Sequence, residues 1–172
     1  MTPVLWRRAT PADAAALSAL GGATFLASFA HDHPGEALLT HIAKAHGLDY
    51  YRDALADPEQ IAIIGETALG APVAYALLTP PNLPVALEPG DYELKRIYLL
   101  GPWQSGGHGT ALMEQVYAAA QERGTKRLLL AVYTQNEKAQ AFYARQGFEQ
   151  IGRTTFMVGD AAFEDLVYAR KM

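Results

Sequence analysis

The residues best placed to do chemistry form a glycine-rich turn near the middle of the sequence. Gln104, Gly107 and Gly109 occur at the spacing Gln-x-x-Gly-x-Gly, between an apolar segment and a segment with helical periodicity. Glycine has no Cβ, so such a turn lets backbone N–H groups approach a diphosphate closely. The start of the following helix adds free N–H donors and a partial positive charge. The pattern therefore predicts diphosphate binding with few basic side chains.

The glycines alone also fit a simpler interpretation, a tight turn between a strand and a helix. The turn is not a P-loop, because no Gly-Lys-Ser/Thr follows it, and neither its spacing nor its late position fits a Rossmann fingerprint. A second polar block lies further along, at 136–149. It opens with Asn136 and ends with Tyr143 and Gly147-Phe148.

Together, in this order, the two blocks resemble the signature of the GNAT superfamily of acetyl-CoA-dependent N-acetyltransferases. The resemblance covers nearly the whole chain and is loosest over the first 60 residues. Within the superfamily the chain is most similar to PaiA-type polyamine acetyltransferases, in Thr24-Phe25-x-x-x-Phe29 and in the segments 93–98 and 156–160. Leu129, where that subgroup has an aromatic residue, and the segment 163–168 depart from its pattern. Both departures concern the acceptor rather than the cofactor.

The resemblance implies that acetyl-CoA is the co-substrate, that no metal takes part, and that acetyl passes directly to an amine. Backbone groups of Ile97, Tyr98 and Leu99 would meet the acetyl and pantetheine arm, with the N–H of Leu99 polarising the thioester carbonyl. Asn136 would bind the pantetheine arm or simply cap a helix. Lys138 would reach a CoA phosphate or stay solvated. The residues expected at the diphosphate are Gln104, Ser105, Gly106, Gly107, His108, Gly109 and Thr110.

Two side chains are candidates for proton transfer. Deprotonating a Lys-like amine at pH 7 costs about 4.6 kcal/mol, which calls for a base or a water chain. By resemblance that base is Glu93, and the alternative is a charged strand residue paired with Lys95 or Arg96. Tyr143 matches the tyrosine that protonates the departing CoA thiolate, and the alternative is a tyrosine packed beside Ala139.

The acceptor is expected to bind against the early helical region. Residues 31–60 carry six acidic and two basic side chains, a net charge of −4, which suits a cationic amine or is simply a solvated acidic face. Phe25, Phe29, His31 and Glu93 are the predicted acceptor contacts. A polyamine-like amine is favoured over a protein amino group, and a non-catalytic acetyl-CoA sensor is the alternative from another functional class. His31-Asp32-His33 invites a metal site, but His41 and His46 should point to different sides of a helix, so none is predicted.

Length and composition indicate the number of domains, the class of partner and the location of the protein. The 172 residues predict one domain, 1–172, and the net charge of −4 argues against a nucleic-acid partner. No run approaches the roughly 20 apolar residues of a membrane span, and no signal peptide is expected. The chain has no cysteine, which fits direct transfer and a cytoplasmic protein. A homodimer through the C-terminal strands is expected by analogy alone.

The elements that must position these residues alternate along the chain. The expected fold class is α/β (α+β): the GNAT fold, a central mixed, mostly antiparallel, twisted sheet of about seven strands with about four to five helices. The sheet should be splayed between its fourth and fifth strands. A first helix should start at Thr10 and stop at Gly21-Gly22. Further helices are expected at 23–30, 35–46, 49–56, 107–123 and 136–147, and strands at 4–8, 60–65, 72–79, 92–100, 127–133, 148–158 and 163–171.

Overall fold

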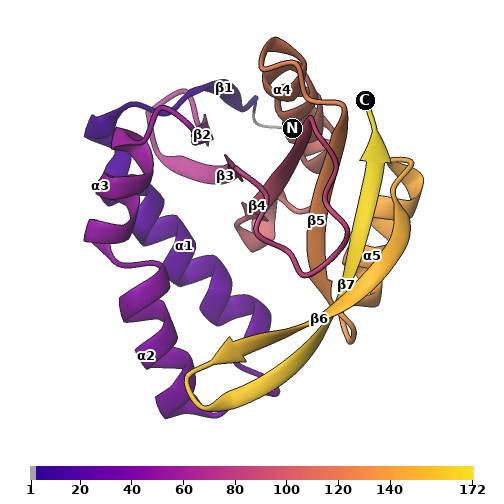
Figure 1. The fold of residues 1–172 in the computed structure, drawn as a ribbon. Helices are drawn as coiled ribbons and strands as arrows, with labels where there is room; N and C mark the ends of the chain where they lie inside the picture. Colours follow the sequence, from indigo (N-terminus) through magenta and orange to yellow (C-terminus); the bar gives the residue numbers. More distant parts are fainter. Residues whose placement is uncertain (1–2) are drawn as a thin grey trace.

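A computed structural model describes residues 3–172, which form one seven-stranded sheet with helices on both faces (Figure 1). The order of strands across the sheet is β1-β2-β3-β4-β5-β7-β6. The strands are β1 (Leu5–Arg8), β2 (Ile61–Glu66), β3 (Pro72–Thr79), β4 (Asp91–Leu99), β5 (Arg127–Tyr133), β6 (Glu149–Val158) and β7 (Ala161–Lys171). The α-helices are α1 (Ala14–Phe29), α2 (Gly35–Ala45), α3 (Leu48–Ala56), α4 (His108–Glu122) and α5 (Glu137–Arg145). The predicted fold class is confirmed.

The sheet opens between β4 and β5. These two strands are the parallel neighbours, and they pair only from Asp91↔Arg127 to Glu93↔Leu129. β4 continues to Leu99 and β5 to Tyr133 without pairing to each other. All other neighbouring strands pair antiparallel. The splay expected between the fourth and fifth strands is therefore present, and it begins at Glu93.

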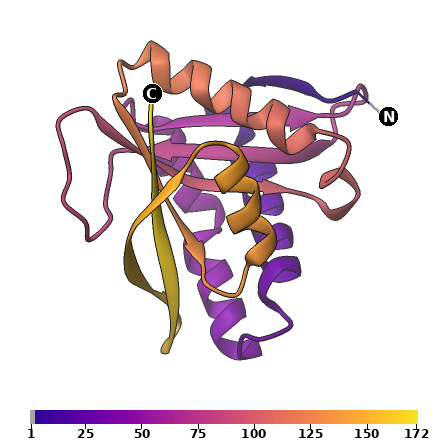
Figure 2. The same ribbon diagram turned by 90° about the vertical axis from the view of Figure 1, so that its right-hand side faces the viewer.

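Side-chain alternation along the strands divides the core between the two faces. On one face, Ile63 and Ala76 pack with α4 and α5, and on the other Ile64 and Leu77 pack with α1 and α3. Figure 2 shows α4 and α5 together in front of the sheet, with the early helices behind it. We call the first the donor face and the second the acceptor face, after the binding sides that the sequence predicts.

The β6–β7 hairpin reaches beyond the sheet to the early helices. In Figure 1 it crosses below the body of the molecule and ends beside α2. Val158 near its tip forms a third buried cluster with Phe25 of α1 and Leu38 of α2. The hairpin thus ties the end of the sheet to α1 and α2, which closes one side of the acceptor face.

The prediction that the first helix stops at Gly21-Gly22 is wrong, because α1 continues to Phe29. Gly21 is there for close packing: a Cβ at this position would lie 2.4 Å from both His46 Nδ1 and the Tyr51 hydroxyl oxygen. The close packing of α1 against His46 and Tyr51 therefore requires glycine at position 21. The lower helix propensity of glycine costs α1 about 1 kcal/mol relative to alanine. A sequence pattern cannot separate such a glycine from a helix stop.

The uninterrupted helix has a second consequence. Pro11–Phe29 has the length and apolar composition of a membrane-spanning helix, which the predicted break at Gly21 concealed. A single helix of this kind near the N-terminus is only a weak sign of a membrane protein, because core helices pass the same test. The residues of α1 that are buried in the protein core are Ala14, Leu17, Leu20, Gly21, Thr24 and Phe25.

Candidate active site

Strand β4 carries Glu93, Arg96 and Tyr98 on the acceptor face. The register slips at Lys95, since Leu78 pairs with Leu94 whereas Leu77 pairs with Arg96. This bulge returns Arg96 and Tyr98 to the side of the sheet that Glu93 occupies. Without it, strict alternation would separate Glu93 from both of them. The bulge therefore builds one polar row beside the splay.

Glu93 lies at the point where β4 and β5 separate. It is 2% exposed, and its Oε2 accepts a hydrogen bond from the backbone N–H of Asn82 at 2.8 Å. Its Oε1 lies 3.5 Å from Lys95 Nζ. Each carboxylate oxygen thus has a partner in the site. The pairing with Lys95, which belongs to the alternative interpretation of Glu93, is present, and no ion pair in the described chain joins Glu93 to Arg96.

Tyr143 approaches the splay from the donor face. It is 8% exposed on α5, with ring centroids 5.5 Å from Phe142 and 5.8 Å from Phe148. Burial raises the pKa of Tyr143, and the nearby phenol of Tyr98 raises this pKa further. Tyr98 belongs to the opposite face, so the two tyrosines lie on the two sides of the sheet where β4 and β5 leave it open. The hydroxyl of Tyr143 has no hydrogen-bond partner among residues 3–172.

The glycine-rich turn presents free backbone donors. Gly106 and Gly107 have φ of +73° and +84°, and Gly107 caps the N-terminus of α4. The first helical hydrogen bond there runs from the N–H of Ala111 to the Gly107 carbonyl. The preceding N–H groups, those of His108, Gly109 and Thr110, make no backbone hydrogen bond to other described residues. Left-handed glycines, free donors and a helix N-terminus together fit a diphosphate, the part of CoA predicted here.

Gln104 links the end of β4 to the start of α5. Its Nε2 donates to the Leu99 carbonyl at 3.1 Å, and its Oε1 accepts from Lys138 Nζ at 3.3 Å. A strand residue points its N–H and C=O to the same side, so the N–H of Leu99 also faces this opening. Asn136 caps α5, because its Oδ1 accepts from the N–H of Ala139 at 3.1 Å.

The predicted acceptor contacts are only partly brought together. Phe25 and Phe29 pack at 4.5 Å between ring centroids, but Phe25 is 2% exposed. The His31 side chain is 68% exposed and lies 3.6 Å from the carboxylate of Asp32. An aromatic cluster surrounds the two phenylalanines, and it comprises His33, His41, His46, Tyr133, Phe156 and Phe163.

The expected separation of His41 and His46 is wrong. Their ring centroids are 5.9 Å apart, because His46 caps the C-terminus of α2 and leaves the helical path. Burial first, then Arg96 and His41, lowers the pKa of His46 to about 2, so this ring is neutral at pH 7. Within residues 3–172 no group of three or more His, Cys, Asp or Glu side chains is arranged to hold a metal ion.

Two charged residues on the acceptor face, Arg96 and Asp165, are not predicted from the sequence as site residues. The sequence suggests Arg96 only as a partner of Glu93, whereas its Nη1 donates to the Tyr51 hydroxyl at 2.9 Å and its guanidinium lies 4.2 Å from the Tyr50 ring centroid. Asp165 is 8% exposed on β7, and burial raises its pKa to about 6. The departure of segment 163–168 from the PaiA pattern was the one sequence signal that pointed toward Asp165.

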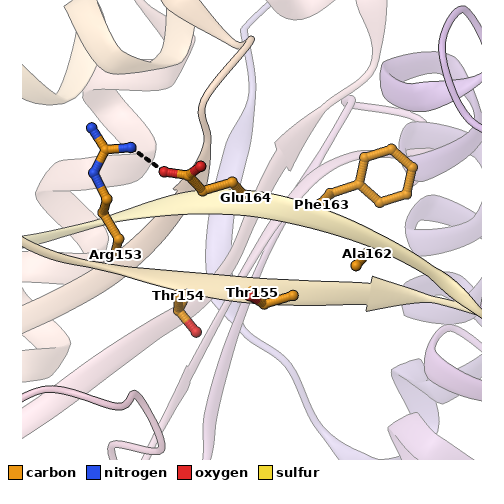
Figure 3. Close-up of a pocket in the computed structure, with 6 residues that line it drawn as sticks. All are labelled: Arg153, Thr154, Thr155, Ala162, Phe163 and Glu164. Atoms are coloured by element: carbon orange, nitrogen blue, oxygen red, sulfur yellow. Dashed lines mark hydrogen bonds and ion pairs between the residues drawn. The ribbon is translucent and has the colours of Figure 1, made fainter.

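A surface hollow of about 400 Å³ lies elsewhere, on the β6–β7 hairpin (Figure 3). An ion pair between Arg153 and Glu164 crosses the two strands beside it. The hollow contains none of the predicted site residues. Its lining consists of Arg153, Thr154, Thr155, Ala162, Phe163 and Glu164.

Comparison with known proteins identifies the family. Residues 26–148 match the Acetyltransferase (GNAT) family. An "Uncharacterized N-acetyltransferase" of Mycobacterium tuberculosis is 33% identical over 164 residues, which cover 93% of this chain and 98% of that protein. Among solved structures, the fold is similar to PaiA N-acetyltransferase from Thermoplasma acidophilum in complex with coenzyme A, with a TM-score of 0.80, 15% identity and 99% of each chain covered. Ribosomal-protein-alanine N-acetyltransferase from Brucella melitensis gives a TM-score of 0.71 at 24% identity, covering 98% of this chain and 99% of that one. The chain therefore belongs to the GNAT family of acetyltransferases, and the predicted enzyme class, an N-acetyltransferase that uses acetyl-CoA, is confirmed.

Proposed function

We propose that the protein transfers acetyl directly from acetyl-CoA to the primary amine of a small acceptor that enters from the acceptor face. The observation that carries this proposal is the opening of the sheet after Glu93↔Leu129, with Tyr98 on one face and Tyr143 on the other. Acetyl-CoA supplies an activated acetyl group as a thioester. The amine nitrogen forms a bond to the carbonyl carbon, and the carbon–sulfur bond breaks. The nitrogen loses two protons, one from the ammonium group before the attack and one as the amide forms, while the thiolate takes up one, so that one proton is released to solvent.

The backbone of β4 and α4 is proposed to hold the donor. The N–H of Leu99 faces the opening and would polarise the thioester carbonyl, alongside Ile97 and Tyr98. The free N–H groups that begin α4 would take the diphosphate. Lys138, which already meets Gln104 at 3.3 Å, would add a positive charge nearby.

Glu93 and Tyr143 are proposed to move the two protons. Both oxygens of Glu93 are engaged by Asn82 and Lys95, so we expect it to accept the ammonium proton through a water molecule rather than directly. Tyr143 would donate its proton to the thiolate and regain one from solvent. Its hydroxyl has no partner in the described chain that would have to be displaced first.

For the identity of the acceptor, the sequence favours a polyamine-like amine. The acidic residues of segment 31–60, which suggest a cationic acceptor, pair with different basic side chains. Asp49 pairs with Arg52, Glu59 with Arg123, and Asp32 with His33. A protein amino group is the alternative acceptor.

We also propose that residues 1–172 act as one cytoplasmic domain, and that a homodimer forms through the C-terminal strands, with β6 at the edge of the sheet.

The test is a thiol-release assay with acetyl-CoA against polyamines, diamines, amino acids, aminoglycosides and a lysine peptide. We expect release on one amine class, reduced about 100-fold or more in Tyr143→Phe. Tyr117→Phe is the matched control, because that phenol of α4 bonds to Gln146 and is not one of the predicted site residues. Acetyl-CoA binding by calorimetry without release on any amine would favour a sensor, and unchanged turnover in Tyr143→Phe would refute its role.

A further inference from the structure

We propose that the acceptor is an amine that also carries a carboxylate, with the carboxylate bound by Arg96 and the ammonium group held by Asp165. This inference rests on the proposed function and replaces its polyamine-like acceptor with an amino-acid-like one. It is carried by two opposite charges on the acceptor face, each lacking a partner of opposite charge within the described part of the chain.

Arg96 is a half-buried cation held by aromatic groups. Its guanidinium lies 4.2 Å from the Tyr50 ring centroid and 5.4 Å from that of Tyr51, and no ion pair involves it within residues 3–172. Burial alone would lower the pKa of Arg96, and Tyr51, Tyr75 and Tyr50 outweigh this effect. Arginine has five N–H donors in a planar fork, and the one hydrogen bond to Tyr51 leaves most of them free.

Asp165 is the complementary anion. It lies on β7 opposite Tyr133 of β5 and Thr154 of β6, and burial is the cause that raises its pKa. No hydrogen bond or ion pair reaches its carboxylate from residues 3–172. An unpaired carboxylate that is 8% exposed destabilises a fold, so its place here calls for an explanation beyond stability.

The two charges lie on the same face of the sheet, on either side of the opening between β4 and β5. Both residues lie on the acceptor face, Arg96 beside Tyr98 on β4 and Asp165 next to Tyr133 across the splay. A small molecule lying along Tyr98 would therefore meet a cation on one side and an anion on the other.

Both groups remain open to a ligand. Within residues 3–172, Gln60 Oε1 is the one fully buried side-chain polar atom that has no hydrogen-bond partner. The unpaired oxygens of Asp165 and the unpaired N–H groups of Arg96 therefore each keep contact with solvent. Neither charge is sealed inside the core.

A zwitterion matches this arrangement better than a polyamine does. A carboxylate accepts two parallel hydrogen bonds from a guanidinium fork, and the ammonium group pairs with Asp165. A polyamine would leave Arg96 unpaired and place a second cation close to it, which is unfavourable in a half-buried site. The aromatic rings of Tyr50 and Tyr98 are suited to the apolar part of such a molecule.

The experiment compares amines in matched pairs that differ by one carboxylate. Thiol release with acetyl-CoA is measured for lysine against 1,5-diaminopentane, ornithine against 1,4-diaminobutane, phenylalanine against phenethylamine, and 4-aminobutyrate against butylamine. We expect the carboxylate-bearing member of at least one pair to have the higher kcat/KM by about 10- to 100-fold. Arg96→Gln should remove that difference by raising KM for the acid, with KM for acetyl-CoA unchanged.

Arg52→Gln is the matched control, because this exposed arginine of α3 forms an ion pair with Asp49 of the same helix, away from the predicted site residues. Arg96→Lys separates charge from fork geometry and should recover only part of the preference. Thermal stabilisation by the acids in the presence of CoA gives a readout that needs no turnover, and it too should vanish in Arg96→Gln.

The outcomes distinguish the two proposals. Release on diamines that equals or exceeds release on their carboxylate partners would overturn the zwitterionic acceptor and leave the acetyltransferase proposal standing. Release on no amine would contradict the proposed function, and the thermal measurement would then decide: no stabilisation by any acid overturns the Arg96 site. An acid preference that survives Arg96→Gln would overturn it as well.

Discussion

The two faces of the splayed sheet bury different kinds of side chain. On the donor face, α4 contributes Leu112, Met113 and Val116 to a core with strand residues such as Leu128 and Leu130. On the acceptor face, α1 and α3 also bury apolar residues, but the same layer contains the hydrogen-bonded series His46, Tyr51 and Tyr75 together with Arg96. The donor face thus combines apolar packing with the free backbone N–H groups at the start of α4, whereas the acceptor face contains a network of polar side chains.

This contrast follows from what each face is proposed to recognise. A diphosphate can be held by backbone N–H groups, so the side chains of the donor face are free to pack. An acceptor must be selected by its own charges and shape, which only side chains can read. The donor face should therefore tolerate side-chain changes that keep its glycine conformations, whereas the acceptor face should respond to single polar substitutions.

The largest expected effect tests the point where the two faces meet. Glu93→Gln keeps an oxygen that can accept from the N–H of Asn82 but removes the charge. We expect kcat to fall about 100-fold, because the ammonium proton loses its acceptor, while the free energy of unfolding changes little. Steady-state kinetics and urea denaturation measure the two quantities. Glu114→Gln, at an exposed position of α4, is the control, and equal kcat values for both variants would remove Glu93 from the mechanism.

The next effect concerns packing on the acceptor face. Gly21→Ala would place a Cβ 2.4 Å from His46 Nδ1 and from the Tyr51 hydroxyl oxygen. We expect a loss of about 1–3 kcal/mol in the free energy of unfolding, because neither group is a flexible chain end. Gly35→Ala is the control: nothing lies within 4 Å of its Cβ, and alanine favours the helix. A Gly21→Ala protein as stable as the parent would mean that α2 and α3 can move away from α1.

The contrast also explains what could be predicted from sequence. Gln104, Gly107 and Gly109 lie within six residues, and Asn136 and Tyr143 within one helix, so local spacing is enough to identify the donor face. The hydrogen-bonded network on the acceptor face joins His46 and Tyr51 to Tyr75 of β3 and Arg96 of β4, three separate parts of the chain. Their contacts depend on the bulge at Lys95 and on a glycine that permits close packing, and neither has a recognisable local pattern.

The smaller third effect is a pH dependence from Asp165. Burial raises the pKa of this carboxyl from its ordinary value of 3.8 to about 6 in the folded protein. Between pH 4 and pH 6 the unfolded chain loses this proton while the folded protein keeps it, so stability falls as pH rises through this window and is constant above it. Asp165→Asn should therefore stabilise the protein at pH 7 by about 1–2 kcal/mol after solvent screening, and have little effect at pH 4.

Urea denaturation at both pH values checks this, with the exposed Asp53→Asn as the control expected to stay within about 0.5 kcal/mol. If Asp165→Asn destabilises the protein at pH 7, the carboxylate has a stabilising partner and is not free for a ligand. That result would also weaken the contrast between the faces, because Arg96 would then be the one unpaired charge of the pair proposed on the acceptor face.

The smallest effect tests the backbone character of the donor face. Gly107→Ala adds no clash, since nothing lies within 4 Å of the new Cβ, but it forces alanine to φ of +84°. We expect a cost of about 1 kcal/mol, seen in stability or in a several-fold higher KM for acetyl-CoA as the turn relaxes and its N–H groups lose alignment. Gly101→Ala has the same open space without a positive φ, and it should change neither quantity. If both variants bind acetyl-CoA equally well, the free donors that begin α4 do not depend on the left-handed turn. The donor face would then have to rely on side chains such as Gln104 and Lys138, as the acceptor face does.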